Sequence, residues 1–230
     1  MRWHPLDPDQ TIHTATYGFS AGTSRTSLIP LRDGAVVVFS PGRGLADAAA
    51  PLLEAAPHLF LLAPSAGHTL GLAEWQARYP SAQVLTAPAA SARIQKHISG
   101  TPGSLDALEA WLPPEVSVHM PPVQRLGETW LRVERGGRVY WFVCDAFINA
   151  GPLSGSLLTQ CAKRLYRVGP GLEMTRLFVW SVSDRAAFRA WVAERLSAGA
   201  ADALVPCHGD IDLSVDIGER LLALVAARCG

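Results

Sequence analysis

The sequence predicts an α/β (α+β) fold of the four-layer αββα kind, in which two sheets pack face to face and helices cover both outer faces. Strand-like and helix-like segments alternate along the chain in two similar halves. Apolar residues make up 49% of the 230 residues and charged residues 17%, so a large core can form. No segment rich in Gly, Ser or charge separates the halves, so we expect one domain over residues 1–230.

The first half is expected to open with an antiparallel meander and to continue with alternating helices and strands. Apolar runs separated by Gly, Arg-Asp-Gly and Pro-Gly indicate the meander. The expected strands cover residues 11–19, 27–31, 35–40, 58–62 and 83–86. Ala- and Leu-rich segments that end at Pro or Gly indicate helices at residues 47–56, 70–79, 89–99 and 104–112. The run at 58–62 is continuously apolar, which is typical of a strand covered on both faces.

The second half repeats this plan. Arg135-Gly136-Gly137-Arg138 predicts a tight hairpin turn between two strands. The expected strands cover residues 116–119, 129–133, 139–143 and 203–207. Helices are expected at residues 153–166, 184–196 and 214–228, the second of them with Asp184 as its N-cap. The periodicity of residues 174–181 does not decide between helix and strand.

Charge and composition limit the classes of binding partner that we expect. The net charge is zero and no basic run occurs, so we expect no binding to nucleic acid or to an anionic membrane surface. No apolar run approaches the roughly 18–20 residues of a membrane-spanning helix. The first ten residues lack the apolar core of a secretion signal, so we expect a cytoplasmic protein. The four cysteines form no C-x-x-C pair, which argues against a zinc ribbon.

Three short segments carry residues with metal-binding chemistry, each directly after an expected strand. Residues 59–72 read LFLLAPSAGHTLGL and contain His68. Residues 142–147 read FVCDAF and contain Asp145, and residues 205–210 read VPCHGD and contain His208 and Asp210. Imidazole and carboxylate groups at strand ends are the usual ligands of divalent metals.

These segments, in this order, resemble the metallo-β-lactamase superfamily. Its H-x-H-x-D-H motif falls on residues 63–68, where only the last ligand, His68, is present. Ala63, Ser65 and Gly67 stand at the other three ligand positions, and a later Gly-His position falls at residues 121–124, which hold no His. The resemblance implies the αββα fold, a bridging role for Asp145 and a final ligand role for His208, whereas the other metal's ligands are lost.

The retained residues, His68, Asp145 and His208, form a two-His, one-carboxylate set. Three such ligands suffice for one divalent metal, with Zn as the first expectation and Fe or Mn as alternatives. Asp210 is expected to assist as a catalytic residue, by orienting a group or transferring a proton. His119 lies near the vacated first metal position but precedes the usual ligand place. Cys144 and Cys207, each next to an expected ligand on a strand, are expected to face away into a core layer.

Residues 62–80, in which a Glu-Trp helix follows the remaining His, are similar to a divergent branch of the superfamily that has lost the first His pair. Two functions stay open. The three mutually consistent ligands favour a single-metal hydrolase acting on an unknown small molecule. The loss of the first metal site favours a non-catalytic descendant with a vestigial site that binds a small molecule or a protein. Neither the substrate nor the oligomeric state follows from the sequence.

Overall fold

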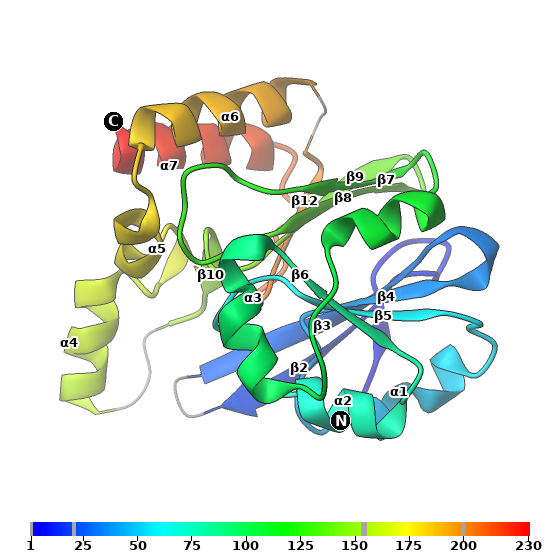
Figure 1. Cartoon of the computed structure of the whole chain (residues 1–230). Coiled ribbons are helices and arrows are strands. Elements are labelled where there is room, and N and C mark those ends of the chain that lie inside the picture. The colour runs from blue at the N-terminus through cyan, green and yellow to red at the C-terminus, as the bar shows by residue number, and fades with distance from the viewer. Residues whose placement is uncertain (1, 20–21, 153–155, 199–200) are drawn as a thin grey trace.

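The computed structural model describes residues 2–19, 22–152, 156–198 and 201–230. A six-stranded sheet and a four-stranded sheet pack face to face, and helices lie over the outer face of each (Figure 1). The predicted four-layer αββα fold is therefore confirmed.

The first sheet has the order β1-β2-β3-β4-β5-β6. It is antiparallel from β1 to β4 and parallel from β4 to β6. Its strands are β1 (His4–Pro5), β2 (His13–Phe19), β3 (Gly22–Pro30), β4 (Val36–Phe39), β5 (Leu59–Ala63) and β6 (Gln83–Thr86). The outer face carries α1 (Ala46–Leu53), α2 (Leu72–Arg78) and α3 (Pro88–Ile94). The continuously apolar β5 lies between two parallel neighbours and is buried on both faces, as its sequence predicts.

The second sheet has the order β12-β9-β8-β7, with β12 parallel to β9. Its strands are β7 (Val116–His119), β8 (Trp130–Arg135), β9 (Arg138–Val143) and β12 (Ala203–Pro206). A separate pair joins β10 (Ile148–Ala150) to β11 (Gly171–Glu173). The helices are α4 (Leu157–Tyr166), α5 (Arg176–Ser181), α6 (Arg185–Ala198) and α7 (Ile217–Cys229). Gly136 and Gly137 both have positive φ, 56° and 72°, which gives the tight β8–β9 turn that the sequence predicts.

The structure corrects several predicted helices. The segment 89–99 is α-helical only to Ile94 and continues as a 3₁₀ turn at Gln95–His97, and the segment 104–112 is a 3₁₀ helix at Leu105–Trp111. Both segments are short, and short runs readily take the tighter winding. The undecided segment 174–181 contains α5, and Asp184 caps α6 by accepting a hydrogen bond from the Ala187 amide at 2.9 Å. Residues 153–155 of the helix predicted at 153–166 lie outside the described residues.

Three apolar clusters hold the four layers together. The central cluster joins both sheets and includes Phe39, Leu62, Phe142 and Val205. A second cluster packs α1–α3 on the first sheet, and a third packs α5–α7 on the second sheet. Each fully buried large apolar side chain contributes about 1.5–3 kcal/mol, so burial in these clusters dominates the stability. Within the described ranges, no helix is both long and apolar enough to cross a membrane.

The three site segments meet at one edge of the sandwich because of this topology. His68 follows β5 in the first sheet, whereas Asp145 and His208 follow β9 and β12 in the second. Strands β9 and β12 are parallel and in register from Ala203–Tyr140 to Pro206–Val143, so the loops that follow them leave the sheet side by side.

Candidate metal centre

His68, Asp145 and His208 converge so that one atom of each faces the other two. His68 Nε2 lies 3.2 Å from His208 Nε2. Asp145 Oδ1 lies 3.6 Å from His68 Nε2 and 3.4 Å from His208 Nε2. Metal–ligand bonds of ~2.0–2.1 Å at tetrahedral angles place ligand atoms about 3.3 Å apart. The spacing of the three donor atoms therefore fits a single tetrahedral ion, and these residues could hold a metal.

The other ring nitrogen of each histidine is held by the protein. His208 Nδ1 lies 3.2 Å from the Thr23 carbonyl, which only accepts hydrogen bonds, so this nitrogen carries the proton. His68 Nδ1 lies 2.8 Å from the Ser40 hydroxyl. When Nδ1 donates outward, the lone pair on Nε2 of a neutral imidazole points at the centre. Outer hydrogen bonds of this kind orient histidines that bind metals.

Asp145 has one oxygen in the centre and the other held by a neighbouring side chain. Ser65 Oγ donates to Asp145 Oδ2 at 2.5 Å, which leaves Oδ1 facing the two histidines. Burial alone would raise the pKa of Asp145, but His208 and His68 hold it well below its usual range. Burial likewise opposes protonation of His208, but the hydrogen bond and charge of Asp145 raise its pKa above the usual value. Without a metal, the site therefore favours a carboxylate beside a protonated imidazole.

Glu128, which the sequence reading did not single out, holds the loop that carries Asp145. Its carboxylate is fully buried and accepts hydrogen bonds from the backbone amides of Cys144, Asp145 and Ala146 at 2.9–3.1 Å. The Trp130 indole donates a fourth bond at 2.8 Å. Burial and then the charge of Asp145 raise the pKa of Glu128 to about 8, against the effect of these donors.

Arg25, also missed from the sequence, holds the loop that carries His208. It lies on β3 of the first sheet, and its guanidinium donates to the carbonyl of Gly209 at 2.7 Å. The Arg25 amide donates to the Cys207 carbonyl at 2.7 Å. Gly209 has a φ of +92°, and a Cβ there would lie 2.0 Å from the Asn149 carbonyl oxygen, so only glycine fits. Both sheets therefore position His208.

The two thiols next to the ligands enter the core as expected, but they also come close to the site. Cys144 and Cys207 belong to the apolar cluster between the sheets. Their sulfur atoms and a ring nitrogen of His68 nevertheless lie within 4.8 Å of one another. Burial raises the pKa of the Cys144 thiol well above its usual value, which disfavours the thiolate that a metal requires. Burial therefore keeps the Cys144 thiol uncharged close to His68.

Asp210 and His119 have surroundings of their own. Asp210 is exposed, and its backbone hydrogen-bonds Asn149: Asn149 Nδ2 donates to the Asp210 carbonyl, and the Asp210 amide donates to the Asn149 carbonyl. Asp210 is not among the residues that line the cleft, and its assisting role stays a prediction. The His119 ring contacts the rings of Trp141 and Trp191, and one of its nitrogens hydrogen-bonds the Ser117 hydroxyl.

The centre opens into a cleft of about 650 Å³. Asp145 and His208 stand in its wall, beside apolar side chains that include Phe19, Ile148 and Phe178. Arg93 and Lys163 add two cations to the lining. A cleft of this volume suits a small molecule.

No protein-family model matches the chain, and no curated protein matches it. Solved structures do match over nearly the whole chain. The metallo-β-lactamase FIM-1 from Pseudomonas aeruginosa, in its mono-zinc form, is 11% identical with a TM-score of 0.63, covering 100% of this chain and 97% of that one. A metallo-β-lactamase from Hirschia baltica is 10% identical with a TM-score of 0.59, covering 100% and 98%.

A flavo di-iron protein variant from Thermotoga maritima is 14% identical with a TM-score of 0.59, covering 98% of this chain and 61% of that one. Proteins described as zinc-containing and as di-iron thus share this fold. At these identities the likeness concerns the fold alone, and the chain has the metallo-β-lactamase fold.

Proposed function

We propose that the protein binds one divalent metal through His68, Asp145 and His208 and acts as a metal-dependent hydrolase on a small molecule. The mutual separations of 3.2, 3.4 and 3.6 Å between the three donor atoms carry this proposal. Zinc is the first candidate because two imidazoles and a carboxylate supply three of the four ligands of a tetrahedral zinc site and leave the fourth position open. Iron or manganese are alternatives for the same donor set.

The proposed metal, its ligands and the cleft wall have different roles. A divalent ion held here would supply Lewis acidity, polarising a carbonyl or phosphoryl group and making water more acidic. Asp145 contributes the negative charge, and the outer hydrogen bonds of His68 and His208 fix their ring orientations. The apolar wall of the cleft keeps bulk water from a bound substrate, which strengthens the electrostatic interactions inside.

One observation favours a second candidate, a vestigial site in a small-molecule binding protein. Asp145 is satisfied without metal, because Ser65 donates to Oδ2 and His208 can pair with Oδ1 as an imidazolium. A metal must displace that proton, so uptake would release about one proton per chain below the raised pKa of His208.

Metal content distinguishes the two candidates. Protein purified without added metal, and again after zinc loading and desalting, is analysed by inductively coupled plasma mass spectrometry. We expect one equivalent in wild type and a loss of at least tenfold in Asp145→Asn. The control is Asp47→Asn, which removes an exposed carboxylate that pairs with Arg78 and should keep one equivalent.

No metal under either condition would support the vestigial site and overturn the hydrolase. Two equivalents lost together in Asp145→Asn would contradict a single-metal centre. Circular dichroism of each variant checks that a loss of metal is not a loss of fold.

A further inference from the structure

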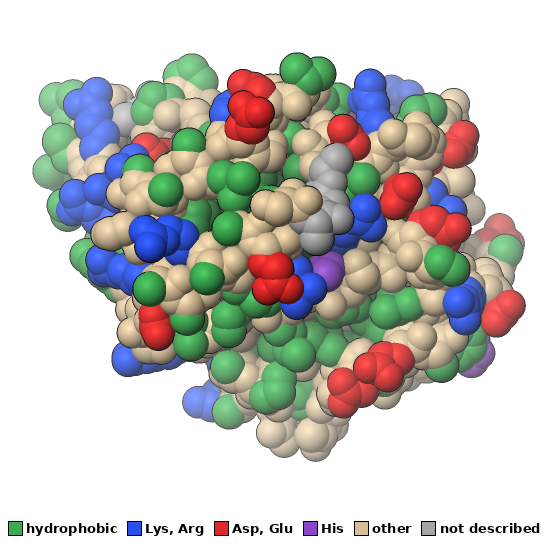
Figure 2. Space-filling model, turned by 90° about the horizontal axis from the view of Figure 1, so that it is seen from above, with side chains coloured by type: hydrophobic (Ala, Val, Ile, Leu, Met, Phe, Trp, Pro, Cys, Tyr) green, Lys and Arg blue, Asp and Glu red, His purple; other side chains and the backbone are tan. Residues whose placement is uncertain are grey.

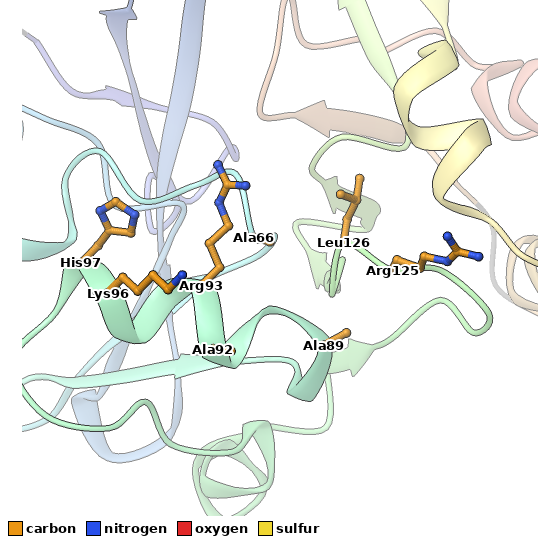
Figure 3. Close-up of a pocket in the computed structure, with 8 residues that line it drawn as sticks. All are labelled: Ala66, Ala89, Ala92, Arg93, Lys96, His97, Arg125 and Leu126. Carbon is orange, nitrogen blue, oxygen red and sulfur yellow. The ribbon is translucent and has the colours of Figure 1, made fainter.

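A second pocket, of about 550 Å³, opens beside the cleft (Figure 3). Three residues line both spaces: Ala66, Arg93 and Leu126. The two spaces therefore adjoin at the loop that leads from β5 to His68. A ligand with its reactive bond at the metal centre can extend past Arg93 into this second pocket.

The second pocket has three cations, Arg93, Lys96 and Arg125, in a lining otherwise made of Ala66, Ala89, Ala92, His97 and Leu126. Arg93 lies on α3 and Lys96 on the 3₁₀ turn that follows it, three residues further along the same face. In Figure 3, Arg93 reaches up toward Ala66 and Lys96 extends beneath it, while Arg125 leaves from the opposite wall and points away from them. Arg93 and Lys96 thus stand on the same wall of the pocket, and Arg125 adds a third positive charge to its lining.

None of these three cations forms an ion pair within the part of the chain that the structure describes. Other arginines do, for example Arg220 with Asp212 at 2.9 Å and Arg228 with Glu173 at 2.9 Å. Unpaired guanidinium and ammonium groups on one wall of a pocket attract anions, and Arg offers the planar fork that matches an oxyanion.

Positive charge gathers around the cleft and the second pocket, although the chain as a whole is neutral. The formal net charge is zero, from 20 basic and 20 acidic residues. Among the described residues, the lining of the cleft and the pocket together contains the cations Arg93, Lys96, Arg125 and Lys163 and a single carboxylate, Asp145. A concave surface lined by one sign of charge concentrates ligands of the other sign.

We propose that Arg93 and Lys96 form an anion subsite for the phosphate or other oxyanion end of a small-molecule substrate. The apolar cleft takes the body of that substrate, and its reactive bond lies at His68, Asp145 and His208. The placement of the reactive bond rests on the proposed function, whereas the anion subsite is inferred from Arg93 and Lys96 independently of the metal. On the face seen in Figure 2, basic side chains are more frequent at the left and acidic side chains at the right, so no continuous basic surface of the kind that binds nucleic acid covers this face.

Anion binding by metal-free protein tests the subsite separately from the metal centre. Protein stripped with a chelator and dialysed is titrated with inorganic pyrophosphate, inorganic phosphate and malonate by calorimetry, at constant low ionic strength. We expect saturable 1:1 binding of pyrophosphate that weakens at least tenfold in Arg93→Gln and in Lys96→Gln. The matched control is Arg189→Gln, which removes the same charge from an exposed position on α6 and should change Kd by less than twofold.

The remaining outcomes are also decisive. No saturable binding, or equal weakening in Arg93→Gln and Arg189→Gln, would overturn the subsite. Tighter binding of malonate than of pyrophosphate, still lost in Arg93→Gln, would support the subsite and assign it to carboxylates. Tighter binding of a ten-residue thymidine oligonucleotide would overturn the small-molecule assignment.

The two proposals fail in different ways. Asp145→Asn should keep pyrophosphate binding while losing metal, and Arg93→Gln should keep one equivalent of metal. Loss of metal in Asp145→Asn with no anion binding in wild type would leave the metal centre standing and remove the subsite.

Discussion

Ser65 donates a 2.5 Å hydrogen bond to Asp145 Oδ2, and this bond leaves Oδ1 as the atom that faces His68 and His208. Ser65 stands where the superfamily motif has its second histidine. The residue at that motif position thus orients Asp145, a ligand of the proposed metal centre. The Ser65 hydroxyl also accepts from the Gly67 amide at 3.1 Å, so the hydroxyl is itself held in place.

Ser65→Ala should weaken metal binding about 10- to 100-fold, because a ligand's supporting hydrogen bond is removed while the ligand stays. Stoichiometry should remain one. Competition for zinc with a chromophoric chelator gives the affinity of wild type and variant. An unchanged affinity would show that the orientation of Asp145 does not depend on Ser65.

Asp145→Asn should make the melting temperature indifferent to a chelator, whereas the wild-type melt should fall when the chelator is added. The amide keeps the shape of the side chain but lacks the negative charge that a divalent ion requires. Apart from the metal, loss of the buried charge should change stability by roughly 1–3 kcal/mol. The same chelator response in both proteins would contradict a ligand role for Asp145.

Glu128→Gln should destabilise the fold by about 2–4 kcal/mol, because the amide nitrogen faces backbone donors that have no other partner. Metal affinity should fall as well, since the Asp145 loop loses its anchor. Urea unfolding measures the first effect and chelator competition the second. Glu134→Gln, at a half-exposed surface pair with Arg132, is the control and should be nearly neutral.

His119 should make wild-type stability depend on pH between about 6.5 and 4. Burial, with Arg195 and Arg132, lowers the pKa of His119 to about 4 from 6.5. The unfolded chain therefore takes up a proton first as the pH falls, and the stabilisation present above 6.5 is lost by about pH 4. After a discount for the partial exposure of His119, the free energy of unfolding should fall by about 1–3 kcal/mol across this pH range.

His119→Gln removes that proton uptake and leaves the metal ligands unchanged. The difference in unfolding free energy between wild type and variant should therefore shrink as the pH falls through this window. A constant difference from pH 7 to pH 4 would show that His119 titrates normally in the folded protein.

Hydrolysis of β-lactams and thioesters at rates typical of two-metal enzymes should be absent. In that mechanism the first metal holds the attacking group, and its ligand positions are Ala63 and Ser65 in this chain. A chromogenic cephalosporin and a thioester assayed with zinc-loaded protein provide the measurement. Efficient turnover that is lost in Asp145→Asn would contradict the assignment.

The sequence by itself predicted the layers and the candidate ligand set. Local signals predict the bounds of β5, β6 and β7 closely. These signals are apolar runs of strand length, helical periodicity, and the Gly and Pro residues at which elements end. The resemblance of three segments to the superfamily's motifs selected His68, Asp145 and His208, each of which follows a strand of the sandwich. Short helices were less predictable, since α and 3₁₀ windings differ little over one or two turns.

Only the tertiary structure decided what surrounds those ligands. Ser65 and Asp145 are 80 residues apart, and Arg25 is 184 residues from Gly209, so no local pattern reports either contact. The alternation of side chains along the strand predicted that Cys144 faces the core, but it did not predict that the thiol lies close to His68. It also did not predict the contact of His119 with Trp141 or the exposure of Asp210. The physical reason is that periodicity selects the face of an element, whereas the packing of distant segments selects which group that face meets.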